Sequence, residues 1–295
     1  MPSFEGVFVP ITTPFSGDDV APARLAANLR RWHAAPLAGY VVLGSTGEFP
    51  MLNEGERDRI LNAAREAIPR DRVFLAGTGA GSTVNTIRQT RRAAEIGADA
   101  AIVITPHYFT RGFAQPAAQI RHYVAVADAS PIPVMLYNFP LNTGINLEAE
   151  TVATIARHPN VCGIKDSSGN MPQAAQIIDQ TPKTFHVLVG AASALLPSLA
   201  IGASGGVLAL GLIAPREFCD VYALARGGRW DEAREIAARM MTADRGVAGR
   251  YGIGGLKAAL DLQGFFGGPC RLPLSTPDGD AIEDIKEVLA TAGLL

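Results

Sequence analysis

The chain has 295 residues, of which 48% are hydrophobic, and a formal net charge of −2 at pH 7. This length allows one large α/β domain or two smaller ones, and the near-neutral charge without a basic cluster disfavours nucleic acid or an anionic membrane as partner, so we expect a small-molecule ligand. Three widely spaced cysteines predict reduced thiols, and the first residues lack a signal-peptide pattern, so we expect a cytoplasmic protein.

Short apolar runs alternate with amphipathic segments through most of the chain. Strands that are apolar on both faces are typical of a parallel sheet covered by helices. Eight such units fit a (β/α)8 TIM barrel better than an open sheet, since the barrel typically takes roughly 250 residues. The predicted strands cover residues 7–11, 39–43, 73–77, 100–104, 134–137, 161–165, 186–189 and 205–208.

Helix signals separate these runs and dominate the end of the chain. Asn53, with Glu56 three residues on, predicts a capping box for a helix over 54–68, and Gly97 predicts the end of a helix over 83–96. After Pro215 only helical patterns follow. We therefore predict a barrel domain over 1–215 and a C-terminal α-helical region over 216–295 packed on it, with helices near 217–225, 230–242, 255–262 and 282–292.

Lys165 is the most informative residue because it ends the apolar run 161–164 and stands directly before Asp166. Burying an ammonium group is costly without a partner, so one explanation is an ion pair with Asp166 or another carboxylate. The other is chemical: a lysine that loses its proton in an apolar pocket is a nucleophile that condenses with a carbonyl group.

Other polar residues follow other predicted strands. Tyr137 ends the fifth strand, Tyr108 follows the fourth, and the stretch GSTGE at 44–48 follows the second. Each has a simpler explanation, as a packing residue or a turn into a helix. In a (β/α)8 barrel, however, the chemistry lies at the C-terminal ends of the strands, so their joint placement with Lys165 predicts one site.

Five motifs spread over nearly the whole chain carry a resemblance to a known family. They are GSTGE at 44–48, TPHYF at 105–109, LYNFPLNTG at 136–144, GIKDSSG at 163–169 and GASGGVLAL at 202–210. With these motifs the chain resembles the pyruvate-dependent class I aldolases of the dihydrodipicolinate synthase and N-acetylneuraminate lyase superfamily. Within it, the stretches GSTGEFP, SPIPVMLYNFPLNTG, HPNVCGIKDSSG and GGPCRLPL are most similar to 4-hydroxy-2-oxoglutarate aldolase, which releases pyruvate and glyoxylate.

The resemblance implies a role for each matching residue. Lys165 would be the Schiff-base lysine, Tyr137 the proton-transferring tyrosine, and Ser45 and Tyr108 its relay partners. The pyruvate carboxylate would lie at Ser45 and Thr46. The further substrate-binding positions would be Gly47, Asn142, Ser167 and the carbonyl of Val207.

The resemblance also implies a lyase that needs no cofactor beyond the covalent Schiff base and no metal. Its partners would be a 2-oxo acid and an aldehyde. It would assemble as a homotetramer, a dimer of dimers, with Tyr108 reaching a neighbouring subunit's site.

Asn142 departs from one branch of this family. Dihydrodipicolinate synthases carry an arginine there that binds the aldehyde's carboxylate, and an amide cannot replace that bidentate charged fork. The sequence therefore favours the aldolase over 4-hydroxy-tetrahydrodipicolinate synthase, and it leaves 2-keto-3-deoxy sugar acid aldolases or dehydratases open.

Three alternatives come from other classes. A dinucleotide-binding oxidoreductase is disfavoured because GxGxxG would need glycine where Ser82 stands. A metal-dependent aldolase is disfavoured because the five histidines show no ligand spacing such as HxH or HExxH. A non-catalytic 2-oxo acid binding protein on the same fold stays open, since fold does not fix function.

Overall fold

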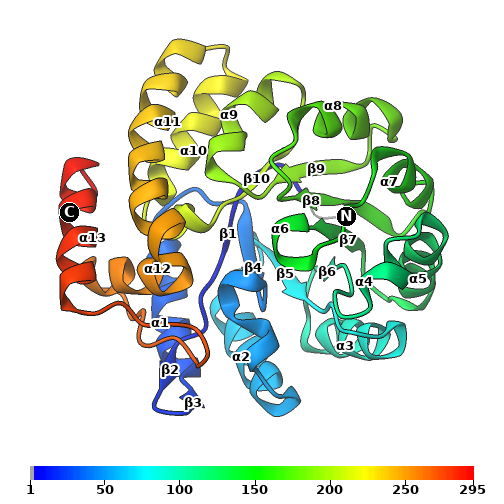
Figure 1. Ribbon diagram of the computed structural model, residues 1–295, viewed down its shortest axis with the longest axis horizontal. Helices are drawn as coiled ribbons and strands as arrows, with labels where there is room; N and C mark the ends of the chain where they lie inside the picture. Colours follow the sequence, from blue (N-terminus) through cyan, green and yellow to red (C-terminus); the bar gives the residue numbers. More distant parts are fainter. Residues whose placement is uncertain (1–2) are drawn as a thin grey trace. The chain divides into compact units, whose positions relative to one another are not determined.

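The computed structural model describes residues 3–295 and contains a closed barrel of eight strands in the order β1-β10-β9-β8-β7-β6-β5-β4 (Figure 1). This confirms the (β/α)8 barrel predicted from the apolar runs, and each strand boundary lies within one residue of its prediction. The barrel strands are β1 (Gly6–Pro10), β4 (Gly39–Val42), β5 (Val73–Gly77), β6 (Ala100–Ile104), β7 (Val134–Asn138), β8 (Val161–Asp166), β9 (His186–Val189) and β10 (Gly205–Val207).

The chain divides into two compact units, which we describe separately. The first comprises residues 3–5 and Val73–Val207, and the second comprises Gly6–Arg72 and Leu208–Leu295. The predicted division into a barrel domain over 1–215 and a helical region over 216–295 stays a prediction, and its first two residues lie outside the described part.

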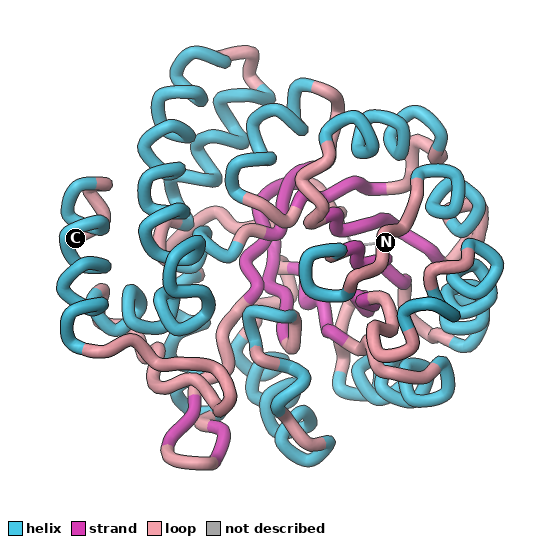
Figure 2. The backbone as a smooth tube through the Cα atoms, viewed as in Figure 1, coloured by secondary structure: helices cyan, strands magenta, loops and turns pink. Residues whose placement is uncertain are grey.

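The first unit holds strands β5 to β10, and its helices lie outside the strands (Figure 2). Its core forms where side chains of β6 to β8 meet those helices, and Tyr123, Leu136 and Ile164 are fully buried there. Gly97 ends α3 as predicted, since it adopts the left-handed conformation at φ 100°. The helices are α3 (Thr83–Ile96), α4 (Thr110–Phe113), α5 (Pro116–Ala129), α6 (Pro140–Thr143), α7 (Ala149–Ile155), α8 (Met171–Gln180) and α9 (Ala192–Ala200).

The second unit combines β1 and β4 with the C-terminal helices, among which α10 and α11 pack side by side (Figure 1). The predicted capping box is confirmed, because the Asn53 side chain accepts from the Glu56 N–H and the Glu56 side chain accepts from the Asn53 N–H. Its helices are α1 (Pro22–Trp32), the short η1 (Ser45–Gly47) and η2 (Phe49–Met51), α2 (Glu54–Ala67), η3 (Ala209–Leu212), α10 (Pro215–Arg226), α11 (Trp230–Asp244), the π-helical η4 (Arg245–Gly249), α12 (Arg250–Leu262) and α13 (Gly279–Thr291).

Two features of this unit were not predicted. A two-stranded ribbon, β2 (Phe15–Ser16) with β3 (Asp19–Val20), is too short to give a period in sequence. Helix α12 begins at Arg250, five residues before its predicted start, because glycines obscure the helical pattern and Gly252 is kinked at φ 59°. No helix within residues 3–295 is long and apolar enough to cross a membrane.

Candidate active site

The carboxyl ends of β7 and β8 bring two predicted residues together in the first unit. Tyr137 pairs in register with Lys165, and both side chains are buried. The Lys165 Nζ lies 4.1 Å from the centre of the Tyr137 ring, which stacks in turn on Phe139. The amine therefore lies over an aromatic ring, and Lys165 and Tyr137 are neighbours, as the strand-end argument predicted.

Asp166 does not neutralise this lysine. Its carboxylate accepts hydrogen bonds from Asn138 Nδ2 at 2.9 Å, from the Ser168 N–H at 3.1 Å and from Ser168 Oγ at 2.7 Å. All three donors are neutral. Lys165 makes no ion pair within residues 3–295, so the predicted structural alternative, a Lys165–Asp166 pair, is not formed.

A buried amide network, which the sequence did not predict, supports the same strand ends. Asn138 is fully buried and pairs in register with Asp166. Its Nδ2 also donates to Asn146 Oδ1 at 2.8 Å, and its Oδ1 accepts from the Leu147 N–H at 3.0 Å. The network fixes the ends of β7 and β8 one residue beyond Tyr137 and Lys165. The sequence did contain a signal for this network, because a polar residue directly follows both Tyr137 and Lys165 at the ends of their strands.

Gly190, directly after β9, makes room for two side chains of the site. A Cβ atom there would lie 1.8 Å from Ser167 Oγ and 3.1 Å from Lys165 Cε. The Ser167 N–H donates to the Asn138 carbonyl and the Gly190 N–H to the Asp166 carbonyl, both at 2.8 Å. These bonds tie the ends of three strands together and hold Ser167 beside the shaft of Lys165.

The other predicted residues of this unit have different surroundings. Tyr108 is 83% exposed in the single chain, and its ring packs edge-on against Phe109. Asn142 is exposed on α6, where its backbone N–H donates to the Phe139 carbonyl. Val207 is fully buried at the end of β10. The geometry of this unit thus joins Lys165, Tyr137 and Ser167.

In the second unit, the GSTGE stretch forms a strained turn after β4. The short helix η1 contains Ser45, Thr46 and Gly47, and Thr13 Oγ1 donates to the Gly47 carbonyl at 2.6 Å. The flanking Leu43 and Glu48 both have positive φ, 59° and 55°. A side chain in this conformation costs of order 1–3 kcal/mol, and such residues cluster at ligand sites.

A buried ion pair that the sequence did not predict adjoins this turn. Lys257 Nζ lies 2.5 Å from Glu48 Oε1, and the two side chains are 1% and 0% exposed. Lys257 also donates to the Pro269 carbonyl at 2.7 Å and lies over the Phe15 ring. Burial lowers the pKa of Lys257, and the Glu48 charge opposes that shift. Lys257, the second buried lysine, is therefore held by a carboxylate, a backbone carbonyl and an aromatic ring.

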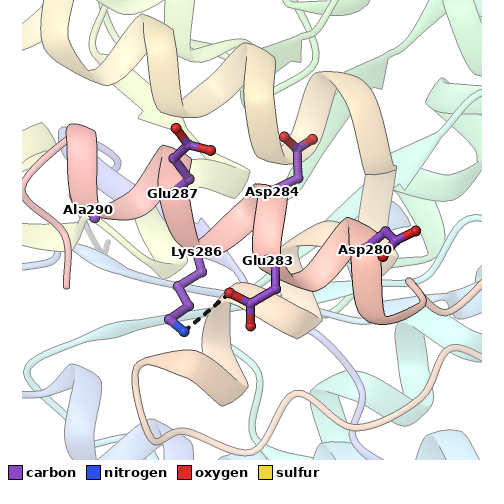
Figure 3. Close-up of a pocket in the computed structure, with 6 residues that line it drawn as sticks. All are labelled: Asp280, Glu283, Asp284, Lys286, Glu287 and Ala290. Carbon is purple, nitrogen blue, oxygen red and sulfur yellow. Dashed lines mark hydrogen bonds and ion pairs between the residues drawn. The ribbon is translucent and has the colours of Figure 1, made fainter.

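A hollow on α13 carries no comparable chemistry (Figure 3). Its lining is mainly acidic, and its one lysine, Lys286, pairs with Glu283 at 3.3 Å. That surface would repel an anionic keto acid. The hollow is lined by Asp280, Glu283, Asp284, Lys286, Glu287 and Ala290.

No metal site accompanies these features in the described chain. Among residues 3–295, no group of three or more His, Cys, Asp or Glu side chains is placed to hold a metal ion.

The closed parallel barrel with a buried lysine at a strand end defines the class of fold, a (β/α)8 barrel. Residues 3–292 match the profile of the Dihydrodipicolinate synthetase family, and the chain belongs to this family, which makes it an enzyme of the lyase class. The resemblance predicted from the five motifs is thereby confirmed at the level of the superfamily.

Individual relatives cover essentially the whole chain. It is 35% identical to a 4-hydroxy-tetrahydrodipicolinate synthase of Methanosphaerula palustris over 98% of this chain and 99% of that protein. It is also 35% identical to an uncharacterized DapA-like lyase of Halobacterium salinarum, over 98% and 94% of the two chains. The crystal structure of YagE, a prophage protein of this family from E. coli K12 in complex with pyruvate, superposes with a TM-score of 0.92 at 29% identity, over 99% of each chain.

Proposed function

We propose that this lyase forms an imine between Lys165 and the C2 carbonyl of pyruvate, and makes or breaks a carbon–carbon bond on that intermediate. One observation carries the proposal. Lys165 is buried at a strand end without a carboxylate partner among the described residues, whereas the other buried lysine, Lys257, is held by Glu48. The pyruvate in the related YagE structure supports the choice of keto acid.

The proposed chemistry uses two groups of the protein, the Lys165 amine and the Tyr137 hydroxyl. The Lys165 amine adds to C2, and loss of water gives an iminium ion that withdraws electrons. In the cleavage direction, Tyr137 accepts the proton of the C4 hydroxyl while the C3–C4 bond breaks, which releases an aldehyde and leaves the enamine of pyruvate on Lys165. Protonation of that enamine at C3 and hydrolysis return free pyruvate and the lysine.

The remaining predicted site residues enter the proposal as follows. Ser45 and Thr46 would hold the pyruvate carboxylate, with Gly47 shaping their turn, and Ser45 and Tyr108 would relay protons to Tyr137. The strain on both sides of the turn supports the carboxylate site, because strained residues cluster where ligands bind. The hydroxyl of Ser167 and the amide of Asn142 would face the second half of the substrate, and the Val207 carbonyl would accept a hydrogen bond from it.

Two candidates compete for the second half of the substrate. The name of the Methanosphaerula relative favours 4-hydroxy-tetrahydrodipicolinate synthesis, in which the enamine condenses with aspartate semialdehyde. Asn142 favours cleavage of 4-hydroxy-2-oxoglutarate, because its neutral amide stands where the synthases carry an arginine for the aldehyde's carboxylate. The comparisons favour the synthase more than the aldolase that the motifs suggested first.

A substrate panel on the wild type and on Asn142→Arg tests both candidates. Pyruvate release is measured from 4-hydroxy-2-oxoglutarate and from 2-keto-3-deoxy sugar acids, and condensation is measured with pyruvate plus aspartate semialdehyde. If Asn142 sets the specificity, the wild type cleaves and Asn142→Arg gains condensation. Condensation by the wild type, unaffected by the substitution, would assign the synthase. No turnover with any substrate of the panel, and no loss of water from the 2-keto-3-deoxy sugar acids, would favour the binding-protein alternative.

We further propose a homotetramer in the cytoplasm, as the family resemblance implies. The exposed Tyr108, Phe109 and Leu141, which are 77–88% accessible in the single chain, support a contact between subunits. Light scattering after size-exclusion chromatography measures the mass in solution. A monomeric mass at enzymatically active concentrations would contradict the tetramer and the role of Tyr108 in a neighbouring site.

A further inference from the structure

The strained turn 44–48 is held from the C-terminal region of its own compact unit. Glu48 has φ 55°, and its backbone N–H donates to the Ser45 carbonyl at 3.0 Å. Its side chain reaches Lys257 of α12 through Oε1 at 2.5 Å and the Arg271 N–H through Oε2 at 2.9 Å. A left-handed glutamate persists only where its surroundings fix it, and these two contacts do so.

Arg271 extends the contact to the next helix. Its guanidinium pairs with Glu56 at 2.7 Å and donates to the Met51 carbonyl at 2.8 Å, and Glu56 also caps α2. Two carboxylates and two cations thus form a cluster without net charge beneath the turn. The cluster consists of Glu48, Glu56, Lys257 and Arg271.

The charge of Glu48 creates a conflict that Lys257 resolves. The proposed function places the substrate carboxylate at Ser45 and Thr46, two to three residues before a buried glutamate. An unneutralised anion there would repel an anionic substrate, and burial strengthens that repulsion because little water screens it. With 1% and 0% exposure, the Lys257–Glu48 pair cancels the charge locally.

We propose that Lys257 is a positioning residue for the carboxylate site: by pairing with Glu48 it cancels the one negative charge within the turn 44–48. The inference rests on the proposed function and adds a role for the C-terminal region in keto-acid recognition. Lys257 itself acts through Glu48 and does not touch the substrate.

The test compares pyruvate with its neutral amide, pyruvamide, as imine-forming probes. Borohydride trapping followed by intact mass spectrometry gives the half-saturating concentration of each probe. The pyruvamide value divided by the pyruvate value measures carboxylate recognition, and this ratio falls when the carboxylate is recognised less well. For Lys257→Met we expect pyruvate to weaken on the order of tenfold and pyruvamide to stay unchanged, as for one unit charge acting over roughly 10 Å at an effective dielectric constant of about 20. The double variant Glu48→Gln/Lys257→Met removes the unpaired charge and should restore the ratio.

Controls separate this role from a general loss of structure. Lys286→Met removes an exposed lysine and should match the wild type. If Lys257→Met does not fold, Glu48→Gln decides, because it leaves no anion and must not lower the ratio. Equal weakening of both probes, an unchanged ratio in Lys257→Met, or no recovery in the double variant would overturn the inference alone. Absence of any adduct on the wild type would reject the proposed function as well.

Discussion

Replacing Gly190 by alanine should disturb Lys165, the proposed Schiff-base lysine, through contact alone. The added methyl group would lie 1.8 Å from Ser167 Oγ, 2.9 Å from Ser167 Cβ and 3.1 Å from Lys165 Cε. The hydroxyl can rotate away, but the Ser167 Cβ is fixed to the backbone, and unstrained carbon atoms approach only to about 3.5–4.0 Å. The end of β9 or the backbone at Ser167 must therefore move, and Lys165 Cε must also give way.

The size of the effect follows from that displacement. Overpacking of this kind costs about 1–3 kcal/mol of unfolding free energy. A shift of the reacting group by about 1 Å can cost roughly 100-fold in rate. We therefore expect Gly190→Ala to remain folded, to unfold at lower urea concentration, and to lose turnover and imine trapping on the order of 100-fold.

Urea unfolding and pyruvate-release kinetics on matched variants check this expectation. Gly81→Ala is the control, because a Cβ there meets nothing within 4 Å. The double variant Ser167→Gly/Gly190→Ala removes the two closest contacts and should regain most of the lost stability. Wild-type turnover and stability in Gly190→Ala would show that the packing between Gly190 and Lys165 does not govern the site.

Three further variants test separate parts of the structure. Tyr137→Phe keeps the ring over Lys165 and removes only the hydroxyl, so trapping with pyruvate should persist while turnover falls at least about 100-fold; unchanged turnover would reject its role in proton transfer. Asn138→Ala removes a donor to Asp166 and the acceptor of the Leu147 N–H, so it should lower the unfolding free energy, measured in urea, by about 2–4 kcal/mol. Asn85→Ala, at an exposed asparagine, is the control. A loss no larger than that of the control would show that the network does not stabilise the strand ends. Burial lowers the pKa of His122 to about 4, so the folded state favours the neutral ring, and that stabilisation is lost as the pH falls from the unfolded value near 6.5 toward 4. Between pH 7 and 4.5 the wild type should lose about 2.5 kcal/mol more than His122→Gln, with His107→Gln as control, and equal pH slopes would refute the assignment.

The sequence predicted the barrel because buried parallel strands must be apolar on both faces, and the resulting runs are visible without tertiary information. The placement of Lys165 and Tyr137 in one site was predictable for a related reason. Once both residues are assigned to the C-terminal ends of parallel barrel strands, they lie at the same end of the barrel. The capping box at Asn53 depends only on residues three positions apart, so it too was predictable.

The contacts beneath the site could not be predicted in this way. Lys257 and Glu48 lie in different elements far apart in the chain, and no local pattern states that a lysine on an amphipathic helix is buried against a glutamate of a distant turn. The pairing of Asn138 with Asp166 depends on the register of β7 and β8, which sequence periodicity alone does not fix. The ribbon of β2 and β3 has two residues in each strand, too few for an alternating pattern.

The most direct test of the central claim is to incubate the protein with pyruvate, reduce it with borohydride, and map the modified peptide by mass spectrometry. We predict a reduced pyruvate adduct on Lys165, and none on Lys257, because only Lys165 is buried without a carboxylate partner in the described chain. Lys165→Met should abolish the adduct. An adduct on Lys257, or no adduct on the folded wild type, would contradict imine formation at the end of β8.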